Sequence, residues 1–147
     1  MSTCGARVSR SDSLEPSPIP SDGFLIVLPW PARTMHPNNK PHRMVLAKAR
    51  RTARHEGKME TMMVISPADR IGLRDAQSVA MSVSFHPPRR PGIMNIDGMI
   101  ASMKSAIDGM ADALGIDDSR FSIAWPETFS EPIKGGRVLV NVSTIPV

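Results

Sequence analysis

The chain has 147 residues and a net charge of +4, the length of one domain and a basic excess that permits a polyanionic partner without requiring one. Its single cysteine excludes a disulfide framework and a cysteine-rich zinc site, and an aromatic content of 4% argues against a stacking platform for single-stranded nucleic acid. The longest uninterrupted apolar run, Phe24 to Pro29, is far shorter than the roughly 18 residues of a membrane span, so the composition predicts a small soluble protein of a reducing compartment, with no membrane partner.

The first 22 residues are rich in Ser and Pro and predict a disordered tail ahead of a single domain over residues 23–147. Residues 23–28 predict a short apolar strand ended by Pro29, and the prolines of residues 30–41 predict a loop. Good helix formers fill residues 42–58, where Gly57 is expected to end the helix. Residues 59–78 are ambiguous: 62–65 could form a strand, and the segment from Pro67 onward resembles a loop.

In the second half of the chain, apolar and small residues alternate over 79–85 and predict a half-buried strand that ends at Pro87. A loop through Arg89 and Arg90 leads to a long helix over 98–114, which Gly115 is placed to terminate. Strands are expected over 121–125 and 137–143. Because strands and helices mix without strict alternation, we predict an α+β fold, a small mixed sheet packed with two main helices in a single domain.

The charge is distributed unevenly along the chain. Residues 31–60 contain eight basic and two acidic residues, a net charge of +6, whereas residues 95–118 contain five acids and one base, a net charge of −4. A basic region and a compact acidic region suit a metal-dependent nuclease, because bases hold a polyanion and acids hold divalent cations. Charge alone nevertheless favours a simpler interpretation, two solvated helices of opposite charge.

The predicted long helix has two distinct faces. Its apolar stripe belongs to the core and consists of Met99, Met103, Ile107, Met110 and Leu114. The opposite face carries Asp97, Lys104 and Asp108, of which the last two are four residues apart and can pair directly. Alone, Asp97 is better interpreted as a helix cap, and residues 115–118 could be only a turn.

Distance is the main objection to a single acidic site. A helix of about 17 residues spans roughly 25 Å and separates Asp97 from Asp117 and Asp118. These acids can share a site only if the chain folds back or a second subunit brings them together.

Short motifs follow one another along the chain in a recognisable order. They are Leu28-Pro29-Trp30-Pro31, His86-Pro87-Pro88, the pair Arg89-Arg90, Asp97 followed by Lys104 and Asp108, Gly115-Ile116-Asp117-Asp118, and Lys134-Gly135-Gly136-Arg137. In this order the chain resembles the RusA family of Holliday junction resolvases, small endodeoxyribonucleases common in phages and prophages. The resemblance covers about residues 24–143.

The resemblance implies a homodimer that cuts branched double-stranded DNA, such as a four-way junction, in recombination and repair. It places the protein in the bacterial cytoplasm, encoded by a phage or prophage. It implies Asp97, Lys104 and Asp118 as catalytic residues, and Asn95, Asp97, Asp117 and Asp118 as ligands of Mg²⁺, or of Mn²⁺ in its place. DNA contacts are expected from Arg89, Arg90, Lys134 and Arg137, and from the basic helix through Arg43, Arg50, Arg51 and Arg54. Residues 134–137 could equally be only a hairpin turn.

Two departures from the family pattern bear on activity. Asn95 stands where the family has an aspartate, and Gly98 where it has an asparagine, while the arginine run is reduced to Arg89-Arg90. An asparagine keeps one oxygen ligand but removes a negative charge, so metal affinity and rate should both fall. The alternatives to an active nuclease are therefore a DNA-binding relative that does not cut and a phage interaction or structural protein.

Overall fold

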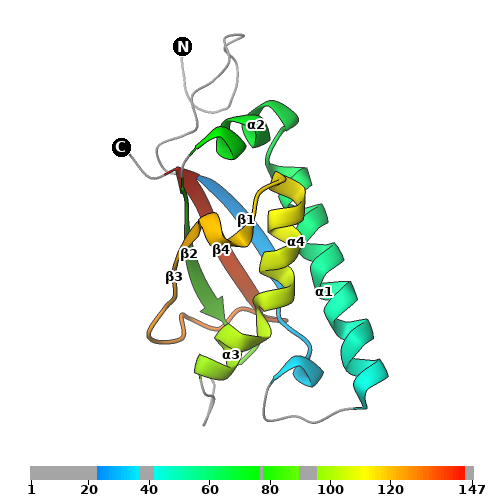
Figure 1. The fold of residues 1–147 in the computed structure, drawn as a ribbon. Coiled ribbons are helices and arrows are strands. Elements are labelled where there is room, and N and C mark those ends of the chain that lie inside the picture. The colour runs from blue at the N-terminus through cyan, green and yellow to red at the C-terminus, as the bar shows by residue number, and fades with distance from the viewer. Residues whose placement is uncertain (1–22, 37–41, 77, 90–95, 145–147) are drawn as a thin grey trace.

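A four-stranded mixed sheet forms one layer of the structure, a computed structural model that describes residues 23–36, 42–76, 78–89 and 96–144 (Figure 1). Its strands are β1 (Phe24–Pro29), β2 (Val79–His86), β3 (Phe121–Ala124) and β4 (Arg137–Thr144), in the order β1-β4-β2-β3. β4 is antiparallel to β1 and β2, whereas β3 is parallel to β2. The four strands predicted from the sequence are confirmed to within one residue at each end. The predicted disordered tail, 1–22, lies outside the described residues.

Helices form the second layer and pack on one face of the sheet (Figure 1). Strand residues on that face alternate with exposed or half-buried ones, as the apolar alternation predicted. Those buried in the core are Ile26, Leu28, Val79, Met81, Val83, Phe85, Val138, Val140 and Val142. The predicted α+β fold, a mixed sheet with two main helices, is thereby confirmed. No helix within the described ranges is long and apolar enough to cross a membrane.

The first main helix, α1 (Arg43–Val64), extends beyond the predicted end at Gly57. Gly57 is buried against α4 (Lys104–Leu114), and a Cβ atom there would overlap the carbonyl oxygen of Ala106. Gly109 of α4 makes the reciprocal contact, because its Cβ would overlap the carbonyl oxygen of Arg54. A glycine inside a helix costs about 1 kcal/mol relative to alanine, and the close helix packing offsets that cost. The expectation that Gly57 ends the helix was therefore wrong.

The ambiguous segment after Gly57 is helical. α1 continues to Val64, so the strand suggested for 62–65 does not form, and α2 (Pro67–Asp75) replaces the expected loop. Ser66 caps α2 by accepting a hydrogen bond from the backbone N–H of Asp69 at 3.2 Å, and Pro67 occupies the first helical position. Ser66 and Pro67 had suggested a loop, but here they cap and begin a helix.

The predicted long helix is divided into α3 (Ile96–Ser102) and α4 by a break at Met103. Gly115 ends α4 as expected, in the left-handed conformation with φ 70°. The five residues of the predicted apolar stripe, from Met99 to Leu114, are all buried. Two short 3-10 turns complete the fold: η1 (Arg33–Met35) follows β1, and η2 (Asp118–Arg120) precedes β3.

The helix crossing can be tested by adding one methyl group. Gly57→Ala should destabilise the protein by about 1–3 kcal/mol, because the new methyl has no space beside Ala106. Urea denaturation monitored by circular dichroism measures this change. The matched control is Gly72→Ala in α2, where the glycine is exposed and the substitution should leave stability unchanged or raise it by up to about 1 kcal/mol. A Gly57→Ala protein as stable as wild type would contradict the close crossing.

Candidate functional site

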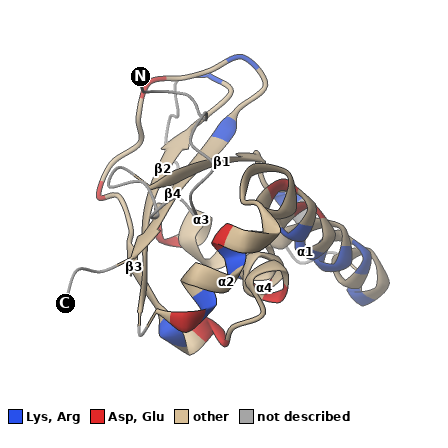
Figure 2. Cartoon of the chain, turned by 90° about the horizontal axis from the view of Figure 1, so that it is seen from above, with Lys and Arg blue, Asp and Glu red and all other residues tan. Residues whose placement is uncertain are grey.

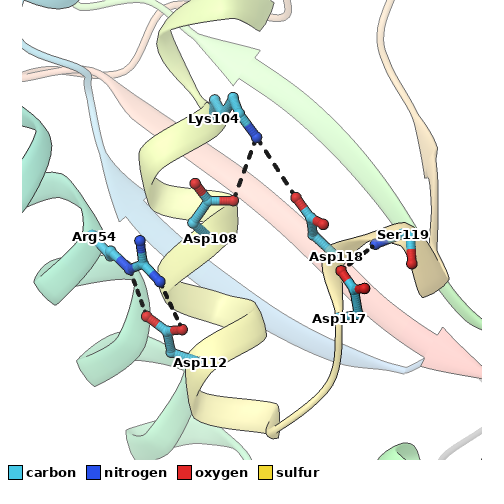
Figure 3. Close-up of polar contacts among 7 residues, drawn as sticks. All are labelled: Arg54, Lys104, Asp108, Asp112, Asp117, Asp118 and Ser119. Atoms are coloured by element: carbon cyan, nitrogen blue, oxygen red, sulfur yellow. Dashed lines mark hydrogen bonds and ion pairs between the residues drawn. The ribbon is translucent and has the colours of Figure 1, made fainter.

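Lys104, at the start of α4, lies between two aspartates (Figure 3). Its Nζ is 3.6 Å from Oδ1 of Asp108, one helical turn further on, and 3.6 Å from Oδ2 of Asp118. The pairing of Lys104 with Asp108 was predicted from their spacing, and it is confirmed. Asp118 arrives by a fold-back of the chain, since the segment after Gly115 turns toward the beginning of α4 before entering β3. Lys104 and Asp118 therefore lie close together, although the helix of residues 104–114 separates them in the sequence.

The neighbouring aspartates of the turn have different surroundings. Asp117 is the N-cap of η2, where its Oδ1 accepts a hydrogen bond from the backbone N–H of Ser119 at 3.2 Å. This backbone hydrogen bond lowers the pKa of Asp117. Asp118 instead directs its carboxylate at Lys104 (Figure 3). Of the two acids, the structure therefore brings Asp118 to the lysine, whereas Asp117 binds its own turn and lies beside the Asp118 side chain, which also lowers the pKa of Asp117.

A groove of about 470 Å³, here called the arginine groove, adjoins the lysine. Residues of α1, η1, α3 and α4 line it: Met35, Arg50, Arg51, Arg54, Ala101, Ser102, Lys104, Ser105 and Asp108. Blue segments repeat along α1 in Figure 2, and three of the four arginines predicted on this helix lie in the groove. Arg43, the fourth, is exposed at the first residue of α1. The basic helix and Lys104 thus share one surface, as a polyanion-binding site requires.

The arginines of the groove are not equivalent. Arg54 makes a two-pronged ion pair with Asp112 of α4, its Nε 2.6 Å from Oδ2 and an Nη 3.0 Å from Oδ1. This hydrogen-bonded pair lowers the pKa of Asp112 and raises that of Arg54. Arg50 and Arg51 form no ion pair within the described ranges. Arg54 therefore joins the two main helices, while Arg50 and Arg51 have charges available for a ligand.

The predicted metal ligands are only partly placed. Asp97 is exposed in the first turn of α3, beside Gly98, which packs against the imidazole ring of His36. Asn95 lies outside the described residues. Within those residues, no group of three or more His, Cys, Asp or Glu side chains is arranged to hold a metal ion. The acids that the structure does bring together are Asp108 and Asp118, on either side of Lys104.

A second basic surface lies at one end of the sheet, where three of the sequence motifs meet. The strand register pairs Arg137 with Pro29 on one side and His86 on the other. The turn before β4 is tied to the end of β2 because the backbone N–H of Ile133 donates to Pro87 at 2.9 Å.

Positive φ values at both glycines of residues 134–137 let this turn pack on Trp30 and Pro88. Lys134, Arg137 and Arg89 are exposed there, while Arg90 lies outside the described residues. Residues 134–137 therefore form a turn into β4 that presents basic side chains, but not the hairpin turn of one interpretation, because β3 and β4 are not neighbours in the sheet.

Sequence reasoning missed the part played by Asp112. Asp112 and Arg54 are 58 residues apart, so no spacing rule connects them. The only available signal was their opposite charge on two predicted helices.

Together these features define a two-layer α+β domain with a lysine–aspartate cluster beside a basic groove. No family model matches the chain. It is 34% identical over 120 residues to an uncharacterized protein of Xylella fastidiosa (strain Temecula1), across 82% of this chain and 76% of that protein. The chain therefore belongs to the same family as this Xylella protein.

The ion pair between Arg54 and Asp112 gives a pH-dependent prediction. Since Arg54 lowers the folded-state pKa of Asp112, the ionised carboxylate stabilises the fold above the unfolded pKa of about 3.9. That contribution is lost as pH falls through the lower folded value. Asp112→Asn should therefore unfold at lower urea than wild type at pH 7, with a smaller difference at pH 3. The loss should be small, since both side chains are more than one-third exposed.

Urea midpoints at the two pH values provide the measurement. Glu127→Gln is the matched control, because it also removes one carboxylate charge, from an exposed loop residue without an ion pair in the described structure. A difference between wild type and Asp112→Asn that stayed constant from pH 7 to pH 3 would contradict the assigned role.

Proposed function

We propose that the chain is a RusA-like endonuclease that binds branched double-stranded DNA and hydrolyses a phosphodiester bond with Mg²⁺ or Mn²⁺. The observation that supports this proposal best is the contact of Lys104 with Asp118 at the border of the arginine groove. A polyanion-binding surface and a cation–carboxylate cluster are the two parts that phosphodiester hydrolysis requires, and here they share Lys104 and Asp108.

The arginine groove would hold the DNA backbone. Arg50 and Arg51 can pair with phosphate oxygens directly, because no carboxylate in the described structure engages them. Lys104, whose side chain is 74% exposed, can turn its ammonium group from the two aspartates to a phosphate oxygen on which negative charge develops. Its position between groove and carboxylates would place the reacting phosphate at the end of the groove.

The carboxylates near Lys104 fit a magnesium site that has few protein ligands. Mg²⁺ in proteins is often held by one or two carboxylates, with waters and substrate phosphates completing the octahedron. Asp118 and Asp108 are the carboxylates that converge, and Asp97, Asn95 and Asp117 are the further ligands implied by the resemblance. The chemistry that Mg²⁺ supplies when bound is activation of a water molecule and neutralisation of phosphate charge.

A DNA-binding protein that does not cut is the second candidate. Two observations favour it: Asn95 replaces a carboxylate of the family pattern, and the described residues contain no group of three ligands. Both candidates are compatible with a homodimer acting in the bacterial cytoplasm, since a four-way junction is roughly two-fold symmetric and a dimer presents two equivalent surfaces to it.

Asp118 and Asp117 offer a matched pair for testing the nuclease. On a labelled four-way junction with Mg²⁺, Asp118→Asn should reduce nicking by roughly 10–100-fold or more, because a carboxylate is lost at the candidate metal site. Asp117→Asn removes the same charge one residue away and should retain more nicking than Asp118→Asn, because Asp118 contacts Lys104 and Asp117 binds the η2 turn. Gel shifts should give unchanged junction affinity for both proteins.

The outcomes separate the two candidates. Nicking by Asp118→Asn at the wild-type level would remove Asp118 from the site. A wild-type protein that shifts the junction but leaves it uncut with both Mg²⁺ and Mn²⁺ would sink the nuclease proposal and favour the second candidate.

The role of the arginine groove in DNA binding can be tested separately through the salt dependence of junction affinity. Arg50→Gln and Arg51→Gln should each weaken junction binding and reduce the slope of log affinity against log salt by about 1, because each removes one phosphate contact. Lys48→Gln is the control, an exposed cation on the same helix that does not line the groove. Equal slopes for all three variants would place the DNA elsewhere.

A further inference from the structure

An apolar pocket of about 270 Å³ lies next to the arginine groove. Three segments enclose it: the end of β1 with the stretch into η1, one face of α1, and the junction of α3 with α4. Trp30 and Met35 come from the first segment, Ala49 and Ala53 from the second, and Met103 from the third. Ligand pockets commonly combine such an apolar lining with a few polar groups that orient what they bind.

Two polar side chains of α1 line the pocket. Glu56 is half-buried there, and its carboxylate makes no hydrogen bond or ion pair within the described parts of the chain. Thr52 lies one turn earlier on the same face. A carboxylate with no partner beside an apolar pocket can accept hydrogen bonds from a ligand that carries N–H groups.

The pocket and the groove share part of their lining. Met35 and Ser102 contribute to both cavities. The Ser102 hydroxyl donates to the carbonyl oxygen of Gly98 at 2.8 Å, so it is already occupied and belongs to the wall. A ligand that spans both cavities would therefore place a negatively charged part on the arginines and a flat apolar part beside Trp30. A nucleotide has this combination, with a charged phosphate and a ring system that stacks on aromatic side chains.

We propose that the apolar pocket holds one unstacked nucleobase of a DNA strand whose phosphates lie on Arg50 and Arg51. This inference rests on the proposed DNA-binding function and adds the means of selecting the substrate. Unstacking costs less where the helical stack is interrupted, as it is where strands exchange between arms, so a base pocket favours the branch point over uniform duplex. Trp30, whose ring also packs edge-on against Phe85, lines the wall of the pocket, and the complementary charges of phosphate and groove fix the direction of entry.

Glu56 adds a preference among bases. Cytosine, adenine and guanine carry an exocyclic amino group that can donate to a carboxylate. Thymine has no amino group, and its one donor, N3–H, lies between two carbonyl oxygens that repel a carboxylate. A junction with cytosine at the branch point should therefore bind more tightly than one with thymine. The preference should disappear in Glu56→Leu, which keeps a side chain of similar bulk without the acceptor.

The test uses the full chain and a four-way junction with 2-aminopurine at the branch point, a base analogue whose fluorescence rises when it is unstacked. Wild-type protein should raise the fluorescence and bind the junction more tightly than uniform duplex. Ala53→Phe, which fills the pocket, should abolish the rise and weaken junction binding by roughly 10-fold, without changing duplex binding. Ala68→Phe, at an exposed position of α2, is the control and should behave as wild type. Thermal unfolding checks that both variants fold.

Each result has a defined meaning. If wild type binds neither junction nor duplex, the proposed function fails and the base pocket fails with it. If wild type binds through Arg50 and Arg51 but 2-aminopurine stays dark and Ala53→Phe binds normally, the base pocket alone is overturned. If Ala53→Phe changes the oligomeric state in light scattering and leaves junction binding unaltered, the occupant is a second copy of the chain, which also overturns the proposal. Should Ala53→Phe not fold, the cytosine–thymine comparison in Glu56→Leu decides.

Discussion

The close crossing of α1 and α4 is the constraint on which the rest of the structure depends. Gly57 and Gly109 let the two helix backbones touch, so that each glycine lies against a carbonyl oxygen of the other helix. This contact sets the register in which Arg54 reaches Asp112, and it brings the basic face of α1 to the side of Lys104. The arginine groove and the apolar pocket both lie on the side of the crossing that faces η1, because Met35 of η1 lines both cavities. Two residues without side chains thereby position the charged residues of the candidate site.

Several parts of this arrangement could be predicted from the sequence. Apolar residues recur at every second position from Val79 to Phe85, as on the buried face of a strand, and at every third or fourth position from Met99 to Leu114, as on the buried face of a helix. The structure confirms both predictions. Lys104 and Asp108 pair because four residues make one helical turn. Such predictions succeed because they depend on local geometry alone.

The remaining parts depend on contacts between distant segments. A glycine can end a helix or permit a close helix crossing, and nothing near Gly57 reveals that the backbone of Ala106 will lie against it. Ser66-Pro67 is compatible with a loop or with a capped helix, and the outcome depends on the packing of α2. The choice between Asp117 and Asp118 required the path of the chain after Gly115, because adjacent residues in a turn point in different directions. The resemblance to a nuclease family only predicted which residue types to examine, and the tertiary fold decided which of them meet.

The position of Lys104 has a consequence for how its substitution should be interpreted. Its ammonium group lies between Asp108 and Asp118, each 3.6 Å away, and so acts as the counter-ion of both. Removing it would leave two carboxylates facing each other, and their mutual repulsion would disturb the turn that carries Asp118. Under the proposed function, a loss of nicking in Lys104→Ala would then combine two causes, the missing cation and the displaced acid. Lys104→Arg, which keeps the positive charge between the aspartates, separates the two: it preserves the electrostatic balance of the cluster while changing the shape of the donor presented to a phosphate.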